Sequence, residues 1–423
     1  MKIKTVVLFL LIIPLTLSTG CWDYKEYESL AMVSAVGFDC NSTASEITVT
    51  LQYLVPGGGS SQSGGGGSKS SAGSTVVKAK GNSIDDAFTK IQQAVGKKLF
   101  FGYMQEVILG DSAAKQIVMD IIGYFDRSPN IRASAYLAVT PQRAEDILSA
   151  NDPNIAELPA KNIHNLIDQS INTGNAYPVS IQDFEEDIVR KGVEAAAPRI
   201  MAITSSDVTS NSSASTPSGE TSEDNQNDVV VLSERKKGYF KVDGMAVFHG
   251  ENLAGWLDGS QSVGLGLMRG QKLNNYEIVK TSAESKIANT LVFRITSSKC
   301  KIKIELGNNK PVADINVYVE ADLRKFSKNV KADFFTPKVI DMLDKRLADN
   351  IKNELSDSLQ KGQKELKTDV FAIGFNFYRQ YPKLWHSKYE RIWDKMFPDL
   401  QTNMSVTAKV IDTGTNIQKT TSK

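Results

Sequence analysis

The chain has 423 residues, of which 49 are lysine or arginine and 48 are aspartate or glutamate. This even balance of charge argues against a general nucleic-acid-binding protein, which concentrates a basic excess on one domain. The length allows two or three domains with well-filled cores. Three cysteines are too few for a fold held together by disulfides.

The amino terminus has the organisation of a secretory leader. Lys2 and Lys4 precede an apolar stretch over residues 6–17, and small residues lead up to Cys21. A transmembrane helix needs roughly 20 apolar residues, so this stretch is too short to be one. The pattern predicts a signal peptide over residues 1–20. A plain secretory signal and an uncleaved anchor are the alternatives.

The cysteine that follows Gly20 makes this leader resemble a bacterial lipoprotein signal. The resemblance implies cleavage after Gly20, a diacylglycerol on the thiol of Cys21 and an N-acyl chain on the new amino terminus. Two acyl chains hold a protein stably on a membrane, whereas one chain is marginal. Such signals usually carry leucine three residues before the cysteine, and this chain has Ser18 there.

Two low-complexity segments divide the chain. Residues 56–75 are rich in glycine and serine and predict a flexible loop. Residues 205–228 are polar and acidic, which predicts a disordered linker. We therefore expect an N-terminal domain over residues 22–204. A middle β-rich domain (229–280), a C-terminal domain (281–415) and a tail (416–423) are expected to follow.

Strand and helix patterns alternate before the linker. Apolar runs predict strands, and apolar positions with a helical period predict helices between them. The strands are expected at 30–38, 47–55, 75–80, 100–109 and 133–139, and helices at 83–95, 111–125, 161–172 and 181–191. This order predicts an α/β domain with mixed strand directions.

Beyond the linker, strands are expected at 229–232 and 238–248, and residues 291–295, 300–306 and 315–323 alternate as strands with one buried face. A long helix over 336–367 carries leucine or isoleucine every fourth residue, and a last strand is expected at 404–411. These elements predict a C-terminal α+β domain with helices on one face of an antiparallel sheet.

The sequence offers no catalytic or metal-binding motif. The three histidines are isolated, and no zinc spacing, P-loop or nucleophile elbow occurs. We therefore expect no enzyme, no metal and no cofactor apart from the acyl chains on Cys21. Cys40 and Cys300 are expected to be separate small side chains, although a disulfide between them stays open.

An aromatic segment near the C-terminus is the most distinctive local pattern. Trp385 and Trp393 belong to a series in which an aromatic residue recurs every three or four positions between 378 and 397, with basic residues between them. Pro382 is expected to start a helix there. We favour a stripe that faces the core, with a solvated basic back. The alternative is a face for a partner or for the membrane interface.

Several motifs, in this order along the chain, resemble the Ger(x)C family, the lipoprotein C subunits of spore germinant receptors. They cover most of residues 21–412. The matching segments are Cys21-Trp22-Asp23, Gly37-Phe38-Asp39, Phe101-Gly102-Tyr103, Val107-Ile108-Leu109-Gly110, Arg127 to Arg132, Ala144 to Leu148, Gly244 to Phe248, Gly255-Trp256-Leu257-Asp258, Asp369-Val370-Phe371, Gly374, Tyr381 to Trp385, Trp393-Asp394 and Phe397-Pro398.

The resemblance implies a non-enzymatic lipoprotein of three α/β domains on the outer surface of the spore inner membrane. Its expected partners are a polytopic A subunit, a transporter-like B subunit and, through Cys21, membrane lipid; nucleic acid is not expected. The alternative is an extracytoplasmic solute-binding lipoprotein of a transporter, which would require two similar lobes around a cleft.

The motifs also supply the candidate residues for structural or partner contacts, which are Trp22, Asp23, Arg127, Arg132, Trp256, Asp258, Trp385 and Trp393. Arg127 and Arg132 are expected to pair with carboxylates between a strand and a helix, and simple solvent exposure is the alternative. Trp385 and Trp393 are expected to support folding first and partner contact second.

Overall fold

The computed structural model describes residues 29–55, 73–128, 131–151, 158–204, 229–232, 236–280, 290–307, 310–326 and 336–412. The leader with Gly20 and Cys21, the residues Trp22 and Asp23, and the segments 205–228 and 413–423 lie outside these ranges. So does most of the predicted glycine-serine loop. Within the described ranges, no helix has both the length and the apolar character to cross a bilayer.

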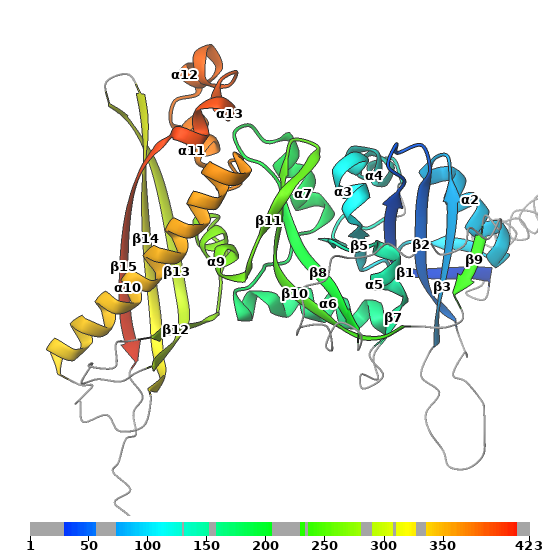
Figure 1. Ribbon diagram of the computed structural model, residues 1–423, viewed down its shortest axis with the longest axis horizontal. Helices are drawn as coiled ribbons and strands as arrows, with labels where there is room; N and C mark the ends of the chain where they lie inside the picture. The colour runs from blue at the N-terminus through cyan, green and yellow to red at the C-terminus, as the bar shows by residue number, and fades with distance from the viewer. Residues whose placement is uncertain are drawn as a thin grey trace, which may run out of the picture.

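Two sheets lie at opposite ends of an elongated molecule (Figure 1). The larger one has 11 strands in the path order β11-β10-β8-β6-β5-β1-β2-β3-β9, with β4 beside β1 and β7 beside β10. Its strands are β1 (Leu30–Cys40), β2 (Ile47–Val55), β3 (Gly73–Gly81), β4 (Lys98–Phe100), β5 (Glu106–Leu109), β6 (Tyr136–Val139), β7 (Ala150–Asn151), β8 (Ala196–Thr204), β9 (Val229–Leu232), β10 (Lys236–His249) and β11 (Asn252–Leu257).

Helices cover both faces of this sheet because its central strands alternate between two cores. Val107 and Leu109 of β5 face one cluster, whereas Ile108 faces the other. The helices are α2 (Ile84–Val95), α3 (Asp111–Gln116), α4 (Val118–Asp126), α5 (Ala144–Ser149), α6 (Pro159–Thr173) and α7 (Ile181–Val189). Apolar side chains of α5 and α6 fill one core, and those of α2, α3, α4 and α7 fill the other.

The centre of the sheet is parallel and its flanks are antiparallel. β1 pairs in parallel with β5, β5 with β6, and β6 with β8. β2, β3 and β9 extend one side in antiparallel pairs, and β10 and β11 extend the other. This arrangement confirms the predicted α/β class with mixed strand directions.

Hydrogen bonding crosses the divisions that the low-complexity segments predicted. β9, β10 and β11 come from the expected middle domain, yet they pair with β3 and β8 of residues 22–204. β12 (Tyr276–Lys280), from the same expected domain, joins the second sheet. The segment 229–280 therefore has no sheet of its own in the described structure, because a polar linker does not dictate which strands pair across it.

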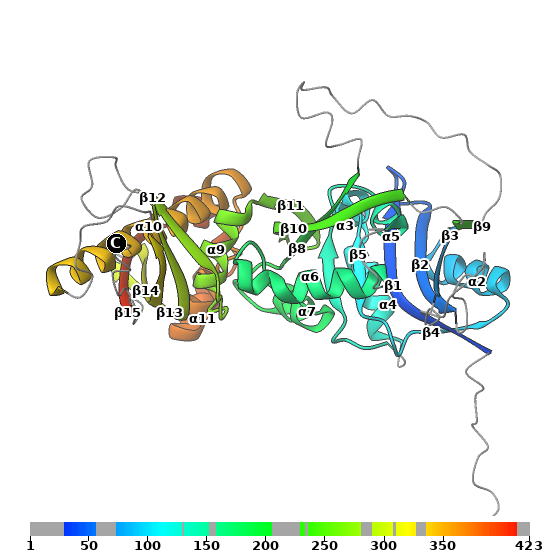
Figure 2. The same ribbon diagram turned by 90° about the horizontal axis from the view of Figure 1, so that it is seen from below.

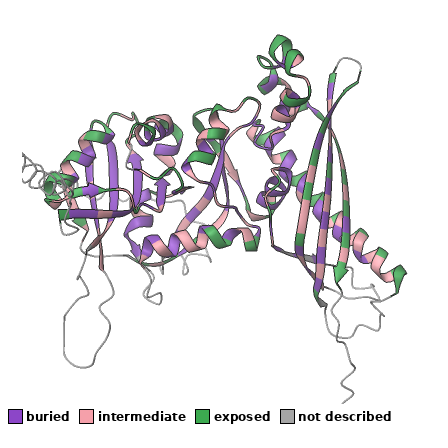
Figure 3. Cartoon of the chain, turned by 180° about the vertical axis from the view of Figure 1, so that it is seen from behind, coloured by how far each residue is buried: buried purple, intermediate pink, exposed green. Residues whose placement is uncertain are grey.

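The second sheet has the order β12-β13-β14-β15, with β13 (Thr290–Gly307), β14 (Lys310–Phe326) and β15 (Gln401–Asp412). β15 pairs in parallel with β14, because α10 (Pro337–Gln360) carries the chain back before β15 begins. The expected antiparallel sheet is therefore mixed. Its strands alternate between buried and exposed residues, whereas the central strands of the larger sheet are buried almost throughout (Figure 3).

One long helix packs on a single face of this second sheet, as predicted. The buried apolar side chains of α10 recur every fourth residue and are Leu343, Leu347, Ile351, Leu355 and Leu359. A π-helical turn over Lys361–Leu366 follows. Gly362 lies in that turn, where an added Cβ would come within 2.3 Å of the Phe371 ring.

Two predicted elements are interrupted. The expected strand over 100–109 is two short strands, because a turn closed by the Met104 N–H to the Phe101 carbonyl (2.9 Å) separates β4 from β5. The expected aromatic helix is a series of short turns: α11 (Ile373–Gln380), α12 (Pro382–Leu384), a π-turn over Trp385–Tyr389, and α13 (Trp393–Met396).

Candidate functional site at the junction of the two sheets

A buried carboxylate organises the segment that joins the second sheet to the first. The residue before α11, Ala372, offers no side-chain acceptor to the helix. Asp369 replaces that cap by accepting hydrogen bonds from the backbone N–H groups of Ile373 (3.1 Å) and Gly374 (2.6 Å). Trp393 donates its indole N–H to the same carboxylate at 2.9 Å. Asp369 thus ties the start of α11 to α13.

Burial and hydrogen bonding act on Asp369 in opposite directions. The side chain is almost fully buried, which disfavours its charged form and raises the pKa to about 6. The donors from Gly374, Ile373 and Trp393 favour the charged form and hold the pKa below the value that burial alone would produce. At neutral pH the group is therefore mostly ionised and accepts all three hydrogen bonds.

The same segment contacts the first sheet through its backbone. The carbonyl of Asp369 accepts the N–H of Glu194 at 3.1 Å, and the carbonyl of Gly192 accepts the N–H of Phe375 at 2.6 Å. Gly192 has a positive φ of 71°, and an added Cβ would lie 2.5 Å from the backbone of Gly374. Glycine is therefore required on the Gly192 side of this contact.

The aromatic segment packs inward. Trp385 and Trp393 are buried with ring centroids 5.3 Å apart, and both lie against Phe377 at 5.7 and 5.9 Å. The interleaved basic side chains, such as Lys388 and Arg391, are exposed. The predicted core-facing stripe with a basic exterior is confirmed. Unlike Trp393, the Trp385 indole N–H has no acceptor among the described residues.

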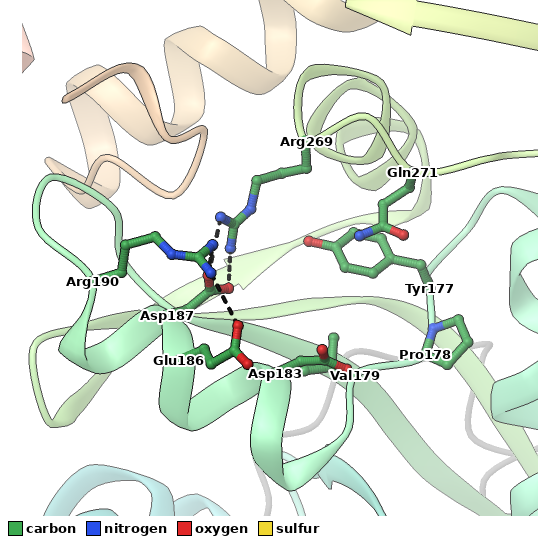
Figure 4. A pocket seen from close by; sticks show the side chains of 9 residues that line it. All are labelled: Tyr177, Pro178, Val179, Asp183, Glu186, Asp187, Arg190, Arg269 and Gln271. Atoms are coloured by element: carbon green, nitrogen blue, oxygen red, sulfur yellow. Dashed lines mark hydrogen bonds and ion pairs between the residues drawn. The ribbon is translucent and has the colours of Figure 1, made fainter. Parts of the chain in front are cut away.

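A polar cavity of about 280 Å³ lies between α7 and the end of α9 (Gly259–Met268). Figure 4 shows the guanidinium groups of Arg190 and Arg269 converging on Asp187. Arg269 pairs with Asp187 through both of its terminal nitrogens. Arg190 lies 3.5 Å from Asp187 and 3.0 Å from Glu186.

The cavity is lined by ion pairs that neutralise one another. Burial raises the pKa of Asp187, and the neighbouring Arg269 opposes this shift. Because Asp187 and Arg269 are 82 positions apart, their pairing joins two distant segments of the chain. The arrangement fits an interlock between α7 and α9, formed by Asp187 and Arg269.

A second interlock involves the predicted residues Trp256 and Asp258. The guanidinium of Arg199, on β8, lies 5.9 Å from the centre of the Trp256 ring and donates to the Asp243 carbonyl at 2.6 Å. Asp258 begins α9 as the first half of a capping box with Gln261. Both residues therefore have structural roles at the boundary of the first sheet.

Arg127 and Arg132 differ from the expectation. Both side chains are exposed, and neither forms an ion pair with a carboxylate in the described part of the chain. Arg127 follows α4, and Arg132 lies in a turn before β6, where its carbonyl accepts the N–H of Ala135 at 3.1 Å. Arg127 and Arg132 are therefore exposed to solvent, which is the alternative that the sequence left open.

Sequence reasoning missed the roles of Asp39, Asp187, Arg269 and Asp369. Asp39 accepts from the N–H groups of Ala144 (2.9 Å) and Glu145 (3.1 Å) and so caps α5 across 105 positions of sequence. Asp39 and Asp369 both belong to the quoted motifs, so the motifs themselves carried the signal. No sequence motif indicated the pairing of Arg269 with Asp187.

The remaining candidate groups are the cysteines and the side chains that could hold a metal ion. Cys40 and Cys300 are both free and half-buried, which settles the open disulfide, and burial raises the pKa of Cys300 to about 11. The described residues contain no cluster of three or more histidine, cysteine or acidic side chains that could hold a metal ion.

Comparisons with known proteins match nearly the whole chain. Residues 23–202 match the family model described as "Spore germination protein N-terminal domain", and residues 243–414 match "Spore germination B3/ GerAC like, C-terminal". Spore germination protein KC of Bacillus subtilis (strain 168) is 25% identical over 419 residues, covering 97% of this chain and 96% of that protein. Spore germination protein B3 of the same organism is 23% identical over 400 residues, covering 94% of each.

A solved structure agrees on the fold. The crystal structure of the GerBC protein matches with a TM-score of 0.53 at 17% identity, covering 89% of this chain and 97% of that one. The fold and the junction define a two-sheet protein whose buried motif residues cap helices and join distant segments. The chain belongs to the Ger(x)C family of spore germination proteins.

Proposed function

We propose that this chain is the membrane-anchored lipoprotein subunit of a spore germinant receptor and serves its assembly and signalling. One observation carries the proposal: both family models match in order, and the relatives named as spore germination proteins KC and B3 align over at least 94% of their length. The anchor is a diacylglycerol on Cys21, with an N-acyl chain on the same residue after cleavage at Gly20. The body then lies on the outer surface of the spore inner membrane.

The expected partners are the polytopic A subunit and the transporter-like B subunit of one receptor. The chain itself is proposed to have no enzymatic activity. In support, the buried acidic groups of the junction act as helix caps and ion-pair partners, as Asp369 and Asp187 do. A solute-binding lipoprotein would need two similar lobes, and the two sheets here differ in strand number and in cover.

The proposal is tested in spores that lack this chain. We expect slower or lost germination with at least one nutrient, restored by the wild-type gene and not by a Cys21→Ala variant. Mass spectrometry of the restored protein should show an acylated residue 21 as its amino terminus. Normal germination with every nutrient, in a strain that also lacks paralogues, would contradict the proposed role.

A further inference from the structure

The amino-terminal ends of four parallel strands point the same way in the first sheet, β4 beginning beside the start of β1 and β5 and β6 beginning beside Ala35, five residues further along β1. β1, β4, β5 and β6 run in parallel, with Leu30 opposite Lys98 and with Glu106 opposite both Ala35 and Tyr136. The segments before β5 and β6 lie side by side, since the N–H of Tyr136 donates to the carbonyl of Gln105 at 2.8 Å. They contain two motifs to which the junction assigns no role, Phe101-Gly102-Tyr103 and the arginine motif over 127–132.

This end of the first sheet exposes aromatic rings. Phe100 is 37% exposed and Tyr103 is 41% exposed, whereas Phe101 between them packs against Phe88 of α2 with ring centroids 5.2 Å apart. The Phe101–Met104 turn fixes the loop that presents them. Rings that are held open to water by an otherwise packed loop are typical of a surface that meets a second phase or a partner.

The same end of the sheet is basic. Lys98, Arg127 and Arg132 are exposed, and Lys97 is partly exposed. Asp126 precedes Arg127 and interacts with Glu185, so acidic groups offset part of this charge. Aromatic rings beside lysine and arginine are the composition that settles at the interface of an anionic bilayer. We call Lys98, Phe100, Tyr103, Arg127 and Arg132 the basic-aromatic edge.

The place where the described chain begins selects the partner. β1 starts at Leu30, directly opposite Lys98, and Figure 2 shows β4 close to the start of β1. The chain between Cys21 and Leu30 spans at most about 30 Å when fully extended. An acyl anchor on Cys21 therefore keeps this edge, rather than the distant second sheet, within reach of the membrane.

We propose that the basic-aromatic edge docks on the anionic phospholipid surface to which Cys21 is anchored. The docking inserts Phe100 and Tyr103 at headgroup level and places Lys98, Arg127 and Arg132 against the phosphates. It fixes the orientation of the body on the membrane, and it gives the exposed arginines a role without a carboxylate partner. This inference rests on the proposed lipid anchor.

The test uses the full lipid-modified chain in vesicles of phosphatidylglycerol with phosphatidylcholine. A polarity-sensitive thiol dye is attached in a Tyr103→Cys variant and, as a matched control, in a Ser405→Cys variant, since Ser405 is exposed on the far sheet. Cys40 and Cys300 are half-buried and burial raises the pKa of both thiols, which limits background labelling, and the unsubstituted chain taken through the same labelling measures what remains. We expect a blue shift of the emission at position 103 and none at position 405.

A second experiment removes the positive charges of the basic-aromatic edge one at a time. Lys98→Gln, Arg127→Gln and Arg132→Gln should each lower the ratio of docked to undocked chain about fivefold. Added salt or pure phosphatidylcholine vesicles should have the same effect. These residues are exposed, so an unchanged melting temperature shows that the variants remain folded.

The outcomes separate the two proposals. A chain that floats with the vesicles while position 103 stays in water overturns the docking edge and leaves the anchor standing. An unmodified Cys21 in a chain that does not float overturns the anchor, and the docking edge falls with it. A blue shift that is equal in neutral vesicles, or that appears only when the other receptor subunits are added, overturns the lipid assignment.

Discussion

Two buried aspartates act at the start of helices that have no cap of their own. Neither Arg143 before α5 nor Ala372 before α11 offers a side-chain acceptor, and Asp39 and Asp369 supply one from elsewhere in the chain. The helix dipole favours a negative charge at these positions, whereas burial disfavours it. Burial prevails in both cases and raises the pKa of each carboxyl.

The hydrogen bond from Trp393 to Asp369 can be weighed by a matched pair of substitutions. Trp393→Phe and Trp385→Phe remove the same group from two buried indoles, but only Trp393 donates to a carboxylate. A hydrogen bond to a charged group contributes roughly 1.5–3 kcal/mol. We therefore expect Trp393→Phe to lower the free energy of unfolding in urea by about that much more than Trp385→Phe. Equal losses would contradict this role for the indole N–H.

The pKa of Asp369 predicts a pH dependence of stability. It is about 6 in the folded chain against an ordinary value of 3.8, so the native state binds this proton more tightly than the unfolded chain does. The free energy of unfolding should therefore fall as the pH rises from about 4 through about 6, by up to ~3 kcal/mol from this group.

Asp369→Asn isolates that contribution. The amide does not titrate, and its NH₂ group would face N–H donors, so the variant should be less stable at every pH. The stability difference between wild type and variant should shrink as the pH rises through the same interval. A constant difference between the two unfolding curves would show that Asp369 titrates near its ordinary value.

At the scale of elements, three distant motifs form one contact around α5. Asp39 at the end of β1 caps the helix, and Gly110 after β5 lies so close that an added Cβ would come within 1.9 Å of the Asp39 carboxylate oxygen. A Cβ on Gly37 would lie 2.9 Å from that of Ala144. Glycine is required at 37 and 110 because strand, loop and helix approach closely there.

This contact predicts non-additive substitutions. Gly110→Ala should push the Asp39 carboxylate away from α5, and Asp39→Ala should remove the cap at a loss of roughly 1–2 kcal/mol. In an Asp39→Ala background the alanine at position 110 meets no carboxylate, so the double variant should lose clearly less stability than the two single losses added together. Additive melting-temperature losses would contradict the proposed clash.

At the scale of the whole molecule, local periodicity predicted the positions of most helices and strands. It did not predict which strands pair across long stretches of sequence. The leucine spacing of α10 and the inward tryptophan stripe are confirmed because each depends on one local period. The division at 205–228 did not separate two sheets, because β8 and β10 on either side of it pair with each other. The motif residues between 369 and 393 indicated where the junction lies. No local pattern connects Arg269 to Asp187.

That ion pair predicts how the two halves of the molecule unfold. Arg269 and Asp187 are both largely buried, and removal of Arg269 leaves Asp187 with only the weaker pairing to Arg190 at 3.5 Å, so the cost should approach the roughly 3–5 kcal/mol of a broken buried ion pair. The end of α9 carries Arg269, and α9 packs on α10 of the second sheet, where Ser358 donates to the Gln261 carbonyl. Arg269→Leu should therefore destabilise the junction strongly and split a single calorimetric transition into two, because α9 loses its pairing with α7. The double variant Arg269→Leu/Asp187→Leu removes both charges and should recover much of the loss. If the double variant is as unstable as Arg269→Leu alone, packing around the arginine, rather than its charge, holds the two sheets together.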